Sequence, residues 1–168
     1  KYPAAPLQIT TGATLLEEEH IKILANLKPL EIIVSLNCVT PAIRRCIMGP
    51  GAGDIPQAVK LFSEYKLPFH GSIVAMPHLT GFAELERTIS FLDAAGAITI
   101  RVFLPGFTRL AADNLVIPQN QQEKLYIFLD KIYSSINSVL LAEPPMISDL
   151  DALVKGVAAD SPAWQAGV

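Results

Sequence analysis

The stretch Glu31-Ile32-Ile33-Val34-Ser35-Leu36-Asn37 decides the fold, because it is a short and nearly continuous apolar run. Runs of this kind are typical of strands that are buried on both faces, as in parallel sheets. Thr40-Pro41 follows at once, and this pair suits the N-cap and first position of a helix. A buried strand that leads directly into a helix indicates a βα unit.

The same alternation continues on both sides of this stretch. Upstream, Leu7–Thr10 is a possible strand, and Leu16–Leu27 has helical periodicity with acidic residues in its first turn. Downstream come a helix from Asp54 to Lys66, a strand over His70–Met76, a helix from Thr80-Gly81 to Gly96 and a strand over Ala97–Leu104. Strands that alternate with helices predict right-handed parallel units. We therefore expect an α/β fold with parallel strands near 31–37, 71–76 and 98–104, adjacent in that order.

The pattern changes after Arg109. A polar stretch opens a helix with Leu125 and Leu129 inward, and Ser138–Leu141 is a possible further strand. Glu143-Pro144-Pro145 is the best linker candidate. We accordingly divide the chain into residues 1–142 and residues 143–168. Both ends have the character of cuts within a larger protein, so we expect a piece that begins within one domain and ends within another.

Composition excludes several classes of function. Of the 168 residues, 51% are hydrophobic and the net charge is −3, so the chain can bury a core but lacks the basic surface that nucleic acid requires. No apolar run is long enough to cross a membrane. Cys38 and Cys46 lie too far apart in sequence for a zinc knuckle, and we expect two reduced thiols packed as small apolar groups. Gly49–Gly53 lacks the Gly-Lys-Ser/Thr that a phosphate loop needs.

Polar side chains near the predicted strand ends are the candidate site residues, because parallel sheets bind ligands at the carboxyl ends of their strands. Ser35 and Asn37 are polar within or after a buried strand, where a hydrogen bond to backbone is the simplest role. His78 suits acid–base chemistry but is alone. Arg101 and Arg109 could each hold a carboxylate. The pair Arg44-Arg45 is expected on a solvated helix face.

Two stretches resemble known families. The longer resembles the later half of radical SAM proteins, closest to an uncharacterised iron–sulfur oxidoreductase-like subgroup that also carries a PDZ domain. Its landmarks are Val34–Asn37, Thr40–Arg45, Met48-Gly49, Gly71–Pro77 and Thr80–Thr88. The shorter stretch, Val157–Val168, is similar to the strand-to-helix entry of bacterial PDZ domains. The resemblance implies an incomplete, TIM-like barrel of parallel βα units and a truncated PDZ-like end.

The radical SAM resemblance also implies cofactors for the full-length protein, namely S-adenosylmethionine and a [4Fe–4S] cluster. The cluster motif CxxxCxxC is absent here, so we expect no cofactor in this piece and no activity from it alone. Some residues would still belong to the S-adenosylmethionine cleft. They are Ser35 and Asn37 near the ribose or amino-acid moiety, Gly71, Ile73 and Ala75 along the adenine, and Leu104 and Phe107 beside it. Ala75 stands where the family usually has glycine, and His78 where it usually has an acidic residue.

Three alternatives remain open for function. The first is a piece of a radical SAM enzyme whose substrate is unknown. The second is a non-catalytic α/β and PDZ module that binds or scaffolds partners, and the third is an ordinary (β/α)₈ barrel enzyme with further units after Leu104. We expect a cytoplasmic protein, with a protein or peptide partner for the PDZ-like part and neither nucleic acid nor membrane. The exposed edge near Leu7–Thr10 is expected to drive self-association, or to be covered by Val139–Ala142 or Leu153–Ala158.

Overall fold

A computed structural model describes residues 7–27, 29–105, 113–142 and 162–165. Phe107, Arg109, the linker candidate Glu143–Pro145 and the predicted strand Leu153–Ala158 lie outside these described residues. The strands are β1 (Leu7–Thr11), β2 (Leu30–Ser35), β3 (Phe69–Val74), β4 (Thr99–Phe103) and β5 (Val139–Ala142). The helices are α1 (Glu18–Ala25), α2 (Pro41–Met48), α3 (Ile55–Glu64), α4 (Pro77–Thr80), α5 (Phe82–Ala94), α6 (Gln119–Tyr133) and α7 (Pro162–Gln165), with a 3₁₀ turn at Asp113–Leu115.

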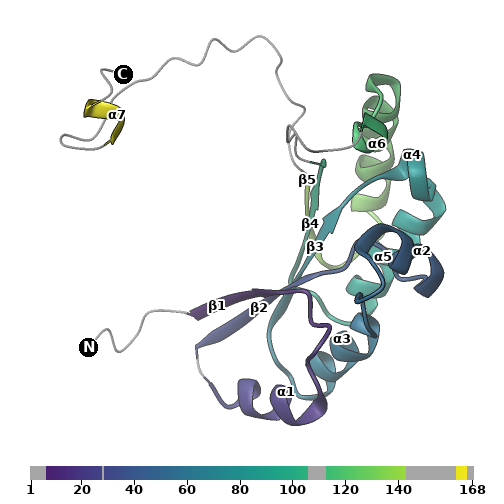
Figure 1. The fold of residues 1–168 in the computed structure, drawn as a ribbon. Helices are drawn as coiled ribbons and strands as arrows, with labels where there is room; N and C mark the ends of the chain where they lie inside the picture. Colours follow the sequence, from purple (N-terminus) through teal and green to yellow (C-terminus); the bar gives the residue numbers. More distant parts are fainter. Residues whose placement is uncertain (1–6, 28, 106–112, 143–161, 166–168) are drawn as a thin grey trace.

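The strands form one parallel sheet in the order β1-β2-β3-β4-β5. The predicted parallel order of the strands near 31–37, 71–76 and 98–104 is therefore confirmed. Helices α1 to α6 lie on one side of this sheet (Figure 1). Parallel sheets need cover on both faces or closure into a barrel, so a sheet with helices on one side is the arrangement of a barrel wall. None of the described helices is long and apolar enough to cross a lipid bilayer.

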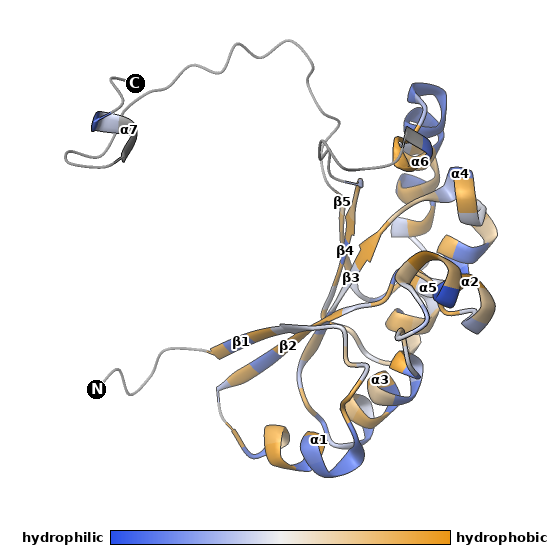
Figure 2. Ribbon diagram, viewed as in Figure 1, coloured by the Kyte–Doolittle hydropathy of each residue, from blue (hydrophilic) through white to orange (hydrophobic). Residues whose placement is uncertain are grey.

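The core lies between the sheet and this helical layer. Ile32 and Ile73 from the strands and Phe62 and Leu92 from the helices are each fully buried. Figure 2 shows apolar residues concentrated where the helices meet the sheet. Burial of large aliphatic and aromatic side chains contributes about 1.5–3 kcal/mol each, so this interface supplies the main stabilising term.

A further βα unit follows Leu104, because α6 leads into β5 and β5 pairs with β4. Asp93 at the end of α5 positions this last strand. Its Oδ1 accepts the Ser138 N–H at 2.7 Å and the Asn137 N–H at 2.9 Å. Burial alone would raise the pKa of Asp93, but these hydrogen bonds outweigh it and hold the pKa below its ordinary value. The possible strand at 138–141 is thus confirmed.

The strands at the two edges of the sheet contradict one of our expectations. Among the described strands β1 pairs with β2 alone, and β5 lies at the opposite edge of the sheet. The prediction that Val139–Ala142 covers the edge near Leu7–Thr10 is therefore wrong, because the α6 crossover carries this strand to the other side, next to β4. Leu7 is 52% exposed at its own edge.

Gly71 lets α5 approach the sheet closely. A Cβ atom built on Gly71 would lie 2.7 Å from Leu92 Cδ1, and Leu92 is fully buried. We predict that Gly71→Ala lowers the free energy of unfolding by about 1–3 kcal/mol, as overpacked cores do.

Urea unfolding followed by circular dichroism measures this loss. The matched control is Ser72→Ala, on the opposite face of the same strand, which should change stability by about 0.5 kcal/mol or less. Addition of Leu92→Ala should make Gly71→Ala nearly neutral. An equal loss in both backgrounds would contradict the steric explanation.

Candidate functional site

The loop that follows β2 is fixed by side chains of α5. The Val39 N–H donates to Thr88 Oγ1 at 3.1 Å. The N–H and the hydroxyl of Thr40 donate to the two carboxylate oxygens of Glu84, each at 2.7 Å. Thr40 is the N-cap of α2, as predicted, but its own side chain does not cap the helix. Glu84 instead accepts the hydrogen bonds, so the start of α2 is held by a neighbouring helix.

The buried negative charge of Glu84 is compensated by several hydrogen-bond donors. Its side chain is fully buried, and Oε2 also accepts hydrogen bonds from Arg87 Nε at 3.1 Å and Nη2 at 2.7 Å. Burial raises the pKa of this carboxyl, but the Thr40 hydrogen bonds and the Arg87 ion pair outweigh burial and leave the pKa below its ordinary value. Glu84 is therefore ionised at neutral pH and serves as a structural anchor.

Arg44 reinforces the same loop from within. Its guanidinium donates to the Val39 carbonyl at 2.7 Å and to the Gly53 carbonyl at 3.2 Å, and the residue is 3% exposed. Arg45 is exposed. The expectation that both arginines lie on a solvated helix face is thus wrong for Arg44. A helix turns adjacent side chains in different directions, and the loop carbonyls provide the acceptors.

Asn37 connects the carboxyl ends of two strands. Its Oδ1 accepts the Val74 N–H at 2.9 Å. Nearby, the Leu36 N–H donates to the Ser72 carbonyl at 3.0 Å. The bond to backbone that we considered simplest for Asn37 is confirmed. The rigid loop and these strand ends form one edge of the sheet.

A row of polar residues crosses the sheet on the face opposite the helices. Ser35 pairs in register with Ser72, and Ser72 with Arg101. All three are partly exposed, whereas alternate residues such as Val34 and Ile100 are buried against the helices. Within the described ranges, the Arg101 side chain has no hydrogen-bond or ion-pair partner. The row thus presents two hydroxyls and one guanidinium.

A second row lies further from the carboxyl ends on the same face. His70 Nδ1 is 2.8 Å from Thr99 Oγ1, and His70 Nε2 is 3.3 Å from Glu31 Oε2. His70 is 7% exposed, so these contacts satisfy a buried imidazole. The two rows place polar side chains on this face of β2, β3 and β4, next to the apolar Ile33, Val74 and Phe103.

The other predicted site residues that the structure describes do not belong to the polar row. Gly71, Ile73 and Ala75 alternate with the polar row and are buried on the helix side. Leu104 is partly buried and packs against the core. The strand ends at Ser35, Ile73 and Leu104 do lie near one edge of the sheet, but the Ser35 and Ile73 side chains are on opposite faces, so the structure does not bring them together. Their roles toward a ligand stay predictions, and Phe107 lies outside the described residues.

His78 contacts backbone, and the two cysteines differ in burial. His78 Nε2 is 2.9 Å from the Asn114 carbonyl oxygen. Cys38 is buried, as expected, but Cys46 is exposed. Burial, with a smaller contribution from the Glu84 charge, raises the pKa of Cys38 to about 11, so its thiol stays protonated. In the part of the chain that the structure describes, no three His, Cys, Asp or Glu side chains are grouped to hold a metal ion.

Sequence reasoning named Arg101 as a possible carboxylate ligand but did not place it near Ser35, and it did not single out Ser72. The signal for the face of Arg101 was the alternation of polar and apolar residues over Thr99–Val102, which is typical of a strand covered on one face only. Glu84 was visible within the Thr80–Thr88 stretch, but sequence alone could not show that its partner is Thr40.

The sequence matches no protein-family model and no curated protein. Solved structures do match. SuiB of Streptococcus suis has a TM-score of 0.67 at 15% identity over 82% of this chain and 32% of SuiB. SuiB bound to S-adenosylmethionine gives 0.65 at 16% identity over 82% of this chain and 31% of SuiB. Histidine-tagged anSMEcpe with bound AdoMet gives 0.56 at 15% identity, over 80% of this chain and 37% of that one.

The chain spans about a third of the length of the solved structures that it matches. The likeness confirms the radical SAM-like fold that the sequence resemblance implied. At this level of identity it shows the fold alone.

The contacts of Glu84 predict that its contribution to stability depends on pH. We predict that Glu84→Gln lowers the free energy of unfolding at neutral pH by about 2–3 kcal/mol, because an ionised acceptor with several donors is lost. A carboxyl whose pKa is lower in the folded protein stabilises the fold at pH values above its ordinary pKa of 4.5. This stabilisation is lost as the pH falls through the pKa of Glu84 in the folded protein. The difference in the free energy of unfolding between the wild type and Glu84→Gln should therefore become smaller in acid.

Urea unfolding at pH 7 and at about pH 3 measures both effects. Glu86→Gln, an exposed carboxylate on the same helix, is the matched control and should change stability little at either pH. A Glu84→Gln penalty that is as large at low pH as at pH 7 would contradict the role of the charge.

Proposed function

We propose that this chain is part of a radical SAM enzyme and contributes one wall of its S-adenosylmethionine and substrate cleft. The observation that carries the proposal is the polar face of the sheet, Ser35–Ser72–Arg101, which lies opposite the helices at the end of the strands where parallel sheets bind ligands. A buried sheet face would be apolar in an α/β protein covered on both sides. The polar row on this face supports our proposal of a lumen that holds a ligand.

The residues of this face fit S-adenosylmethionine by their chemistry. The Arg101 guanidinium can hold the carboxylate of the amino-acid moiety with two hydrogen bonds. The hydroxyls of Ser35 and Ser72 can exchange hydrogen bonds with ribose hydroxyls. Asn37 uses its oxygen on Val74, which leaves its amide nitrogen as a donor at the same edge. S-adenosylmethionine would supply the adenosyl group, which reductive cleavage of the sulfonium carbon–sulfur bond releases to begin radical chemistry.

The residues of this chain do not fit an iron–sulfur cluster. Clusters are held by thiolates, and the chain has two cysteines, one of them buried and protonated. The full-length protein would have to provide the cluster ligands from residues that this chain does not contain. The role of this chain in the proposal is to bind and orient the cosubstrate and substrate, and the substrate and reaction type stay open.

The proposal extends to a second unit. We place the boundary after Ala142 and assign residues 143–168 to a linker and the start of a PDZ-like unit that takes a protein or peptide partner, in a cytoplasmic protein. Helix α7, Pro162–Gln165, lies within the stretch Val157–Val168 that resembles a PDZ strand-to-helix entry. In one of the matching structures, SuiB is bound to its precursor peptide SuiA.

The prediction that follows concerns cosubstrate binding to the polar face. In ¹⁵N-labelled protein, S-adenosylmethionine should shift the amide signals of Ser35, Ser72 and Arg101, with a Kd of about 1 mM because the cluster contact is missing. Signals of Leu85 and Ile89 on α5 should stay in place. Arg101→Gln should weaken binding, and Arg45→Gln, an exposed arginine on α2, should not.

Methylthioadenosine provides the second control, because it lacks the carboxylate. Its affinity should be the same for wild type and Arg101→Gln. Shifts confined to the helical side, or equal losses in the Arg101 and Arg45 variants, would refute the proposed wall.

A further inference from the structure

Among the strands that the structure describes, none pairs with β5 on the side away from β4. The Val139 N–H donates to the Ile98 carbonyl at 3.1 Å, so Val139 directs its main-chain groups toward β4. Successive residues of a parallel strand direct these groups to alternate sides, so the N–H and C=O of Leu140 point to the outer edge. In the described part of the sheet, β5 pairs with β4 alone. Unpaired edges of this kind are templates for another strand.

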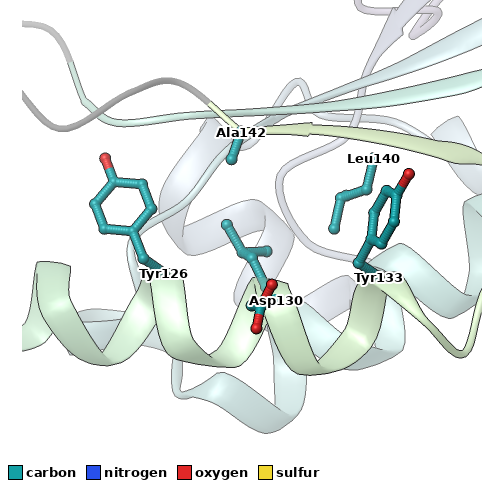
Figure 3. Close-up of a pocket in the computed structure, with 6 residues that line it drawn as sticks. Tyr126, Asp130, Tyr133, Leu140 and Ala142 are labelled. Atoms are coloured by element: carbon teal, nitrogen blue, oxygen red, sulfur yellow. The ribbon is translucent and has the colours of Figure 1, made fainter.

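A cavity of about 220 Å³ lies between α6 and this edge. Its lining residues are Tyr126, Leu129, Asp130, Tyr133, Leu140 and Ala142. Figure 3 shows Tyr126 and Tyr133 rising from α6 on either side, with Asp130 between them and Leu140 and Ala142 extending from the strand toward the helix. A strand added beside β5 would place its helix-side residues next to this cavity, level with Leu140.

The side chains that line the cavity suit a cation. Asp130 is exposed and, within the described ranges, has no hydrogen-bond or ion-pair partner. The neighbouring Lys131 lines a different groove, with Phe82 and Phe128. Two aromatic rings beside a carboxylate suit the alkyl stem and charged head of lysine or arginine. The opposite face of the added strand would meet the exposed apolar side chains of Val139 and Leu141.

We propose that the free edge of β5 and this cavity form a docking site for an extended, basic peptide strand, one lysine or arginine of which enters between Tyr126 and Tyr133. Main-chain pairing with Leu140 supplies affinity, and the cavity supplies specificity. A second copy of this chain fits less well, because its own β5 would offer Leu140 and Ala142 and no cation to Asp130. The cavity lies on the helix side of the sheet, opposite the polar face assigned to S-adenosylmethionine, although Leu141 pairs in register with Arg101 of that face.

The test uses a fluorescein-labelled peptide, Thr-Val-Lys-Val-Thr, and fluorescence anisotropy with the 168-residue chain. Replacement of its lysine by glutamate, or Asp130→Asn in the protein, should weaken binding about fivefold at low salt. Asp54→Asn, which removes an exposed carboxylate outside the cavity, should not. Asp130→Lys should reverse the preference, so that the glutamate peptide binds better than the lysine peptide.

Two peptides that are N-methylated at alternate amides test strand pairing. The one whose methyl groups face β5 should lose binding, and the other should keep it. Equal binding of all peptides, or equal loss with both N-methylated peptides, would overturn the proposal. Sedimentation equilibrium tests the rival occupant: a dimer that the peptide does not displace, that Asp130→Lys leaves intact and that Leu140→Pro dissociates would assign this edge to a second copy, because proline removes the outward N–H of Leu140.

Discussion

A fully buried carboxylate, that of Glu84, ties the loop after β2 to helix α5. Leaving such a group without partners would cost more than most single contacts contribute, so the loop, the start of α2 and the first turn of α5 must be in place together. Thr88 and Arg44 hold the same loop by separate hydrogen bonds. The carboxyl end of β2 is in this way rigid, although it is a loop.

This rigidity matters because of the layer arrangement. Helices cover one face of the sheet and leave a polar row on the other, so the groups that we propose to bind ligand come from strands that pack against the helices. Gly71 lets α5 pack closely against the other face of the same sheet. In this proposal the helix side provides stability and the opposite side provides recognition. The edge at β5 adds a second surface that differs in kind, since it offers main-chain hydrogen bonds and a carboxylate.

The order and direction of the central strands could be predicted from sequence because each is a short apolar run between helices. The fifth strand was a weaker signal, since Val139–Ala142 is short and depends on Asp93 to position it. Ser35 and Asn37 were found because polar groups in a buried run stand out. Gly71, Ile73 and Ala75 were assigned by family resemblance, which does not say which face each side chain takes. Arg44 was misjudged because its acceptors are backbone carbonyls, which no side-chain pattern reveals.

The most direct test of the central claim is native-state hydrogen exchange at the Thr40 and Val39 amides, which donate to Glu84 and Thr88. If the loop is locked as described, both amides exchange only through the opening that also exposes the core amide of Ile73. In Glu84→Gln the Thr40 amide should then exchange by a local opening while Ile73 stays protected. Exchange of Thr40 in the wild-type protein as fast as that of the exposed Gly51 would contradict the account, because the loop would not be a fixed part of the wall.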